Sequence, residues 1–177
     1  SIDLEMRIYE GDQATVNQVS IVGNTKTNEH VVRRELWSRP GDLFSKSDIQ
    51  RSVRQLAQLG HFDSEKLNVI PSPNPSNGTV DLKYLLEERA NDQFEISGGW
   101  GANMFVGTIG IRFANFSIRR IFDKGAWRPV PSGDSQSLSL RASTNGSYYK
   151  SFSISFAEPW LGGKKPTNFS VSLYHSI

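Results

Sequence analysis

The sequence of 177 residues contains no cysteine, and this absence excludes both a disulfide-stapled scaffold and a zinc site built on thiolates. It agrees with an oxidising compartment such as a periplasm, although a cytosolic protein can also lack cysteine. A strong charge of one sign is also lacking, because 20 lysine and arginine residues stand against 18 aspartate and glutamate residues. Nucleic-acid-binding proteins usually carry a basic surface. We therefore expect no nucleic acid among the partners.

Long hydrophobic runs are missing as well. No stretch approaches the roughly 18 apolar residues that a membrane-spanning helix needs. The first residues contain neither a Met nor the basic and apolar regions of a signal peptide, and the last residues lie inside an alternating segment. We expect the sequence to be a piece of a longer chain.

Residues with catalytic or metal-binding chemistry do not cluster in the sequence. His30, His61 and His175 lie in separate segments and lack the spacing of metal ligands. The glycine-rich stretch 98–101 has no Lys-Ser/Thr pair for a phosphate loop, and no serine lies in a Gly-x-Ser-x-Gly motif. These absences predict neither an enzyme nor a protein that holds a metal ion or cofactor.

Residues 13–90 have the pattern of a small α+β domain in the order β-α-α-β-β. Strands are predicted over 14–22, 66–70 and 79–86, and a proline-rich loop over 71–78. One helix is expected to begin at Thr27 or Asn28, and a second at a capping box formed by residues 47–50. Gly60 is expected to end the second helix in a left-handed conformation. Residues 2–8 alternate, and the similarity of 2–10 to 80–88 predicts that residues 1–12 are the last strand of a preceding copy of this domain.

Residues 91–177 contain five successive segments in which apolar and polar residues alternate, each about as long as a tilted strand needs to cross a bilayer. Several aromatic residues lie near the segment ends, as they do in the interfacial girdles of membrane barrels; these are Trp100, Tyr148, Tyr149, Trp160 and Tyr174. The pattern predicts the first five or so antiparallel strands of an incomplete transmembrane β-barrel, whose other strands lie beyond Ile177. A soluble β-sandwich also alternates and remains an alternative.

The connections predict how the strands are oriented relative to the 13–90 domain. The tight turns at 101–103 and 144–149 are expected on the far side of the membrane, and the connections 117–134 and 158–166 on the side of the domain. The longer connection contains Arg119, Arg120, Lys124 and Arg128. These side chains are candidates for contacts with phospholipid head groups, with simple solvation as the alternative.

The candidate functional segment is the first of the five strands, which comprises Gln93, Phe94, Glu95, Ile96, Ser97, Gly98, Gly99, Trp100 and Gly101. Glycines weaken a strand, and the first strand of a barrel must close against the last. A weak seam would offer unpaired backbone groups to an incoming strand. An ordinary bend in the sheet explains the glycines equally well. A second candidate edge, in the 13–90 domain, comprises Lys66, Leu67, Asn68, Val69 and Ile70.

Several motifs resemble the polypeptide-transport-associated (POTRA) domain that precedes the barrel in outer-membrane β-barrel assembly factors. They are Tyr9–Asp12, Val22–Thr27, Val32–Leu36, Pro40–Ser45, Leu59–Asp63 and Gly78–Leu82, together with Ser97–Gly101 and Glu158–Gly163 in the strands. The resemblance covers nearly the whole chain. It implies a barrel-proximal POTRA domain over 13–90, followed by the opening strands of the barrel over 91–177.

The resemblance also implies a function. Such factors are the central component of the machinery that folds and inserts nascent β-barrel proteins in the bacterial outer membrane, without a cofactor and with the POTRA domain in the periplasm. The implied partners are nascent outer-membrane proteins, accessory assembly lipoproteins and outer-membrane lipid. The first strand is implied to template incoming strands. A related polypeptide translocation or secretion transporter and a soluble β-rich binding protein are the alternatives.

Overall fold

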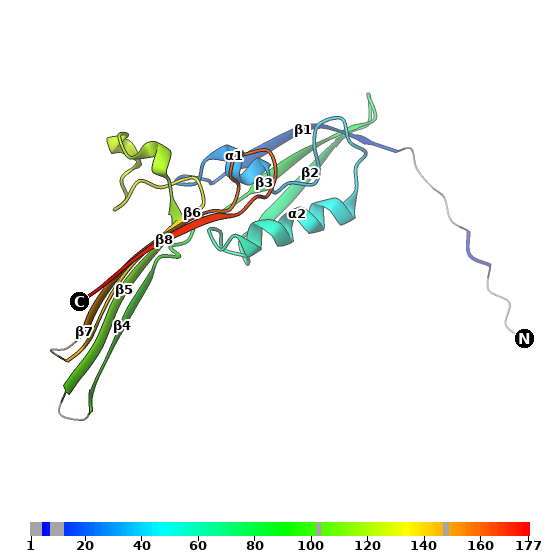
Figure 1. Cartoon of the computed structure of the whole chain (residues 1–177). Helices are drawn as coiled ribbons and strands as arrows, with labels where there is room; N and C mark the ends of the chain where they lie inside the picture. The colour runs from blue at the N-terminus through cyan, green and yellow to red at the C-terminus, as the bar shows by residue number, and fades with distance from the viewer. Residues whose placement is uncertain (1–4, 8–12, 102–103, 147–148) are drawn as a thin grey trace, which may run out of the picture.

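The computed structural model describes residues 5–7, 13–101, 104–146 and 149–177. A three-stranded sheet with two helices occupies one end of the molecule, and a five-stranded antiparallel sheet extends away from it (Figure 1). Within the described residues, no helix has the length and apolar character to cross a membrane.

The first sheet is formed by β1 (Thr15–Val22), β2 (Asn68–Asn74) and β3 (Thr79–Leu85), and the helices are α1 (Glu29–Arg33) and α2 (Lys46–Gln58). The strand order is β1-β3-β2, with β1 parallel and β2 antiparallel to β3. This arrangement confirms the predicted order β-α-α-β-β. Alternate residues of the strands meet the helices in a core, whose buried members are Val16, Val19, Val32, Leu36, Leu56, Phe62, Val80, Leu82, Tyr84 and Leu86.

The predicted start of α2 is wrong by two residues. Its N-cap is Ser45, whose backbone is extended and whose Oγ accepts a hydrogen bond from the Asp48 N–H. Ser47 already lies inside the helix. A backbone contact sets where the helix can start: Phe44 N–H donates to Ala14 O and so holds the residues before the helix against β1. Gly60 follows the helix with φ +73°, which agrees with the predicted left-handed cap.

The predicted strand over 66–70 is also displaced. β2 begins at Asn68 and runs to Asn74, through Pro71 and Pro73. β2 has β3 as its neighbour on one side only, and an edge strand tolerates proline wherever the missing N–H would point away from the partner. The predicted strand over 1–12 lies largely outside the described residues. Residues 5–7 form no regular secondary structure and are exposed.

The second sheet consists of β4 (Gln93–Gly101), β5 (Met104–Phe116), β6 (Gln136–Asn145), β7 (Tyr149–Glu158) and β8 (Phe169–Ser176), each antiparallel to the next. The register forms a continuous apolar row across all five strands, made of Phe94, Ile111, Leu140, Ile154 and Leu173. Phe94 is 75% exposed and Leu173 67% exposed. The opposite face is mainly serine, threonine, glycine and arginine, so the predicted alternation is confirmed.

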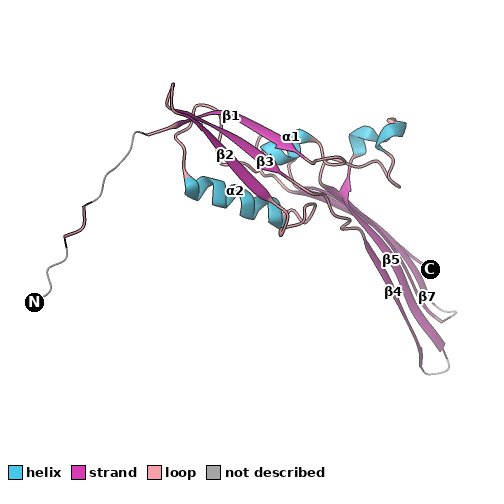
Figure 2. Cartoon of the chain, turned by 180° about the vertical axis from the view of Figure 1, so that it is seen from behind, coloured by secondary structure: helices cyan, strands magenta, loops and turns pink. Residues whose placement is uncertain are grey.

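The connections separate as predicted. The 3-10 helices η1 (Ile118–Arg120) and η2 (Lys124–Ala126) lie in the β5–β6 connection, beside the domain end of the sheet and apart from α1 and α2 (Figure 2). The β7–β8 connection reaches back toward α1 (Figure 1). The predicted turns at the other end include residues 102–103 and 147–148, which lie outside the described residues.

The predicted aromatic girdle is wrong for two of its members. Tyr149 and Tyr174 share the polar face with Ser151 and Ser153, and their hydroxyl groups form a hydrogen bond with each other. Trp100 lies on the apolar face, opposite Phe105. Tyr149 and Tyr174 have the parity of the serines in their own strands, so alternation places them on the polar face although they lie near strand ends.

Candidate functional site: the β4 edge and the domain junction

All nine residues of the predicted seam lie in β4, which forms one edge of the five-stranded sheet. β4 pairs with β5 over its whole length, from Gln93 opposite Arg112 to Gly101 opposite Met104. Among the described residues, no strand pairs with the other side of β4. The structure therefore brings the predicted residues together as one exposed edge, and their role in binding stays a prediction.

The glycines of β4 have two different environments. Gly98 lies opposite Gly107, and the Phe105 ring covers both: an added Cβ would be 3.2 Å from the ring at Gly98 and 2.7 Å from it at Gly107. An aromatic ring over a glycine pair replaces the packing that the pair lacks. Gly99 and Gly101 have no atom within 4 Å of an added Cβ. The edge is thus supported at Gly98 and least packed at Gly99 and Gly101.

An ion pair on the polar face ties the edge strand to the interior of the sheet. Arg141 Nη2 of β6 lies 2.5 Å from Glu95 Oε2 of β4, so the pair passes over β5. Gly110 stands between them in the register, and a Cβ there would be 3.4 Å from the Glu95 carboxylate. Both side chains are about half exposed, so the pair contributes at most about 1 kcal/mol. Sequence reasoning missed it, because the three residues meet only in the observed register.

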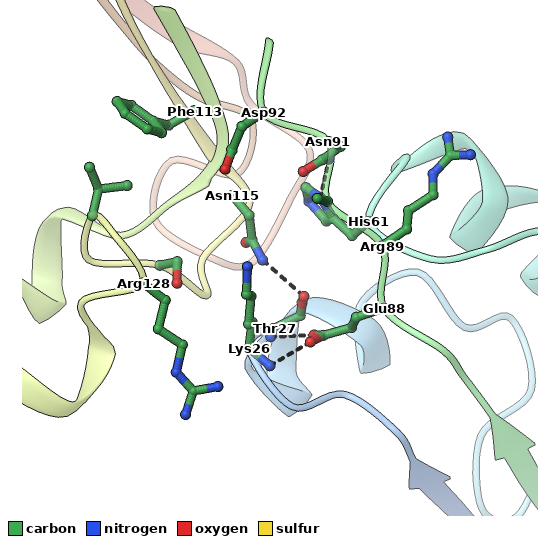
Figure 3. Close-up of a pocket in the computed structure, with 13 residues that line it drawn as sticks. Lys26, Thr27, His61, Glu88, Arg89, Asn91, Asp92, Phe113, Asn115 and Arg128 are labelled. Carbon is green, nitrogen blue, oxygen red and sulfur yellow. Dashed lines mark hydrogen bonds between the residues drawn. The ribbon is translucent and has the colours of Figure 1, made fainter. Parts of the chain in front are cut away.

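The N-terminal side of α1 is joined to the end of β3 by one carboxylate (Figure 3). Glu88 accepts hydrogen bonds from Thr25 Oγ1, Lys26 N and Thr27 N at 2.6–2.7 Å. Burial favours the protonated acid, but these three donors outweigh it and lower the pKa of Glu88. Thr27 Oγ1 in turn accepts from Asn115 Nδ2 of β5 at 2.9 Å. The carboxylate thereby positions a loop that contacts the second sheet.

His61 forms the second contact between the two halves. The ring is 3% exposed, with Nε2 2.7 Å from Ser135 Oγ and Nδ1 2.8 Å from Asn91 Nδ2. Burial lowers the pKa of His61 to about 4, because the nearby Glu88 carboxylate compensates only part of the lost hydration. The ring is therefore neutral near pH 7. The adjoining cavity is about 20 Å³, room for a water molecule and not for a cofactor.

Asp134 makes the third contact. Its buried carboxylate accepts from Asn28 Nδ2 at 2.7 Å and from Ser117 Oγ at 2.6 Å. Asn28 N–H also donates to Gly133 O at 2.9 Å. Because Asn28 is the N-cap residue of α1, these bonds fasten the β5–β6 connection to that helix. On another strand connection, the Arg34 guanidinium stacks 5.1 Å from the centre of the Trp160 ring.

The predicted POTRA edge is only partly an edge. Lys66 and Leu67 precede β2, and the Lys66 ammonium pairs with Glu87. Asn68 Oδ1 accepts from the Val69 N–H at 2.9 Å, and Pro71 and Pro73 have no N–H to offer. The backbone N–H positions of residues 69, 71 and 73 all point away from β3, because alternate residues of an antiparallel strand direct their backbone groups to the same side. The open side of β2 is therefore poor in donors.

The other edge of this sheet is covered. Val16 N–H donates to Asp42 O and Gly41 N–H donates to Val16 O, so residues 41–44 lie along β1. No three His, Asp or Glu side chains of the described ranges come together in a way that could hold a metal ion.

Comparison with known proteins identifies both halves. The POTRA family model, described as "Surface antigen variable number repeat", matches residues 14–89. The chain is 29% identical over 161 residues to the outer membrane protein assembly factor BamA of Neisseria meningitidis serogroup B, a match that covers 91% of this chain and 18% of that protein. It is 28% identical over 158 residues to BamA of Nitratidesulfovibrio vulgaris, covering 89% of this chain and 18% of that protein. It thus spans about a fifth of these curated relatives.

A solved structure shares the fold of both halves. The crystal structure of BamA from Haemophilus ducreyi lacking POTRA domains 1–3 superimposes with a TM-score of 0.72 at 20% identity, covering 94% of this chain and 28% of that one. The molecule is therefore a POTRA domain followed by antiparallel strands that correspond to part of an outer-membrane β-barrel. Residues 14–89 match the POTRA family, and nearly the whole chain is similar to outer-membrane protein assembly factors of the BamA type.

Proposed function

We propose that this chain is the barrel-proximal part of a factor that folds and inserts nascent β-barrel proteins in a bacterial outer membrane. Its POTRA domain lies in the periplasm and β4–β8 lie in the bilayer, with the apolar row toward lipid. The observation that carries the proposal is the β4 edge, which is paired on one side and exposed along all nine residues. The factor acts through binding alone, without catalytic groups or a cofactor.

The β4 edge would work as a template through its backbone. Unpaired N–H and C=O groups are costly in lipid, so the free energy falls when an incoming strand pairs with the open edge. The Glu95–Arg141 ion pair and the Phe105 ring hold β4 in register on β5 while its other side exchanges partners. Because backbone pairing does not depend on the side chains of the incoming strand, this edge can pair with many client strands. Accessory lipoproteins and outer-membrane lipid are the further partners that the proposal includes.

A reversible lock of the seam tests the template. In the full-length parent protein, Ser97→Cys in β4 is combined with a cysteine at the facing position of the last barrel strand. Oxidation is expected to stop the assembly of other outer-membrane barrels in cells, and a reductant is expected to restore it. The amount of folded barrel protein in the membrane measures the effect.

A matched cross-link controls for the disulfide itself. Ser97→Cys with Thr108→Cys joins β4 to the strand that it already pairs with, because these two residues are directly opposite. Assembly is expected to continue with this bond. Normal assembly with the seam locked would contradict the template, and loss of a single client on depletion would favour a dedicated transporter.

A further inference from the structure

The connection between β5 and β6 carries surface features that barrel templating does not use. We call residues 117–135 the η loop, because it contains η1 and η2. It projects from the domain end of the five-stranded sheet, as the yellow-green segment of Figure 1 shows. Its base is fixed by the hydrogen bonds that the buried Asp134 carboxylate accepts from Ser117 and Asn28, so the loop presents its tip from a rigid support.

The η loop lies on the apolar side of the sheet. Ile118 N–H donates to Gln136 Oε1 at 2.7 Å, and Gln136 shares its face with Leu138 and Leu140, since alternate residues of a strand point the same way. Gln136 is fully buried. At the same level, the Phe116 ring meets the Phe156 ring edge to face, with centres 6.3 Å apart. The loop therefore begins where the apolar band of the sheet ends, on the side that faces lipid in the proposed barrel.

Large apolar side chains of the η loop are open to the surroundings. Phe122 is 97% exposed, Ile118 49% and Trp127 50%. The Trp127 indole N–H donates to Ile121 O at 3.0 Å, so its polar group is satisfied inside the loop while half of the residue stays exposed. Exposure of the Phe122 side chain to water is unfavourable, and its insertion into an apolar environment would remove that cost.

The charge of the loop is positive where these side chains lie. Asp123 pairs with Arg120, and Asp134 is buried. Arg119, Lys124 and Arg128 are exposed and have no acidic partner among the residues that the structure describes. Exposed aromatic and aliphatic side chains beside cations are typical of segments that lie in a membrane interface, where the cations attract anionic head groups.

We propose that the η loop is an interfacial anchor, which inserts Phe122 and Trp127 among the phospholipid head groups of the leaflet on the domain side. Arg119, Lys124 and Arg128 would bind the head-group phosphates. The inference rests on the proposed function only in that the strands must lie in a bilayer. Because the same loop holds Asn28 through Asp134, the anchor would also set the level of the POTRA domain below the membrane.

Depth-dependent quenching tests this proposal in the full-length parent protein, with any other cysteine replaced. Ile121→Cys carries an environment-sensitive fluorophore and leaves Phe122 and Trp127 intact. The protein is reconstituted in vesicles of phosphatidylethanolamine and phosphatidylglycerol that contain a quencher near either the head groups or the chain ends. We expect a blue shift at position 121 and stronger loss of fluorescence with the shallow quencher. Phe122→Ser is expected to reduce both, as is omission of phosphatidylglycerol.

Two control positions separate the possible failures. A label at Ile154 on the apolar face should respond to the deep quencher, and one at Ser76 in the β2–β3 turn should stay in water. If position 154 is quenched and 121 remains in water, the anchor is refuted and the barrel stands. If 154 also remains in water, the barrel itself fails. Protection of 121 in native membranes but not in vesicles would refute lipid binding in favour of a protein partner.

Discussion

At the residue scale, Gly23 shows how a single missing Cβ decides the close approach of two strands. Its φ is +102°, and an added Cβ would lie 1.8 Å from Leu86 O. Leu86 N–H donates to Val22 O at 2.8 Å, so the carbonyl has no room to move. Gly23→Ala is expected to lower the free energy of unfolding by at least about 2 kcal/mol, from left-handed strain plus the overlap. Urea unfolding in detergent, followed by tryptophan fluorescence, measures the loss.

Gly41 supplies the control for that substitution. Its φ is +94°, but no atom lies within 4 Å of an added Cβ. Gly41→Ala should therefore cost only the backbone strain, about 1–2 kcal/mol. Equal losses at the two positions would show that the overlap with Leu86 is relieved without cost.

His61 predicts a pH dependence of stability. The unfolded chain binds the proton with a pKa near 6.5, whereas the folded chain binds it at about 4. The unfolded state therefore takes up more protons between these values, and the folded state loses stability as the pH falls from about 6.5 to about 4. From pH 7.5 to pH 5 the loss from this residue is about 2 kcal/mol. Urea unfolding at the two pH values measures it.

His61→Gln isolates this contribution, because glutamine does not titrate and can still bond to Ser135. The variant should be less stable than the parent at pH 7.5 and should lose about 2 kcal/mol less on acidification to pH 5. Identical pH dependence in the two proteins would mean that His61 is hydrated in the folded chain. Glu88 does not mimic the effect, since its lowered pKa makes its contribution disappear only at more acidic pH.

At the element scale, the open side of β2 is protected from pairing with another strand because it presents few backbone N–H donors. Pro71→Thr with Pro73→Thr would restore two outward N–H groups and raise the β propensity of the edge. The double variant is expected to self-associate through β2, and sedimentation velocity over a concentration series in detergent would detect it. Ser72→Thr is the matched control, because it raises the β propensity without adding an outward donor. A double variant with unchanged sedimentation would show that edge donors do not limit pairing.

The sequence predicts elements well where periodicity alone decides them. The strand from Gln93 to Gly101 has the predicted bounds, because nine alternating residues specify one face. Prediction failed where contacts between residues distant in sequence determine the bounds of an element. The hydrogen bonds of residues 41–44 to β1 set the start of α2, and the edge position of β2 allows Pro71 and Pro73 within a strand.

At the scale of the whole molecule, neither the junction nor the bridge over β5 was predictable from the sequence. Asn28 and Asp134 are separated by 106 positions, and Glu95 and Arg141 by 46. Each of these residues is an ordinary polar surface residue in the sequence. Asn28 and Asp134 become partners through the placement of the two halves against each other, and Glu95 and Arg141 through the register of the five-stranded sheet. Local sequence patterns determine neither.

The buried carboxylate of Asp134 predicts how firmly the POTRA domain is held. Asp134→Ala leaves Asn28 Nδ2 and Ser117 Oγ without their acceptor, at a cost of about 1–3 kcal/mol for the buried Ser117 hydroxyl and less for the half-buried Asn28 amide. The domain is then fastened through His61, Thr27, the bond from Asn28 N–H to Gly133 O and the Arg34–Trp160 contact. We expect a broader distribution of distances between spin labels at Ser76 and Ser153 in the full-length protein, measured by pulsed electron spin resonance.

Asp123→Ala controls for a change elsewhere in the η loop, because Asp123 is exposed and pairs only within the loop. This variant should leave the distance distribution unchanged. An unchanged distribution in Asp134→Ala would mean that the remaining contacts fix the domain by themselves. A broadened distribution that narrows again when the protein is moved from detergent to vesicles would instead mean that the η loop and the lipid surface hold the domain together. The position of the POTRA domain would then depend on the membrane as well as on the chain.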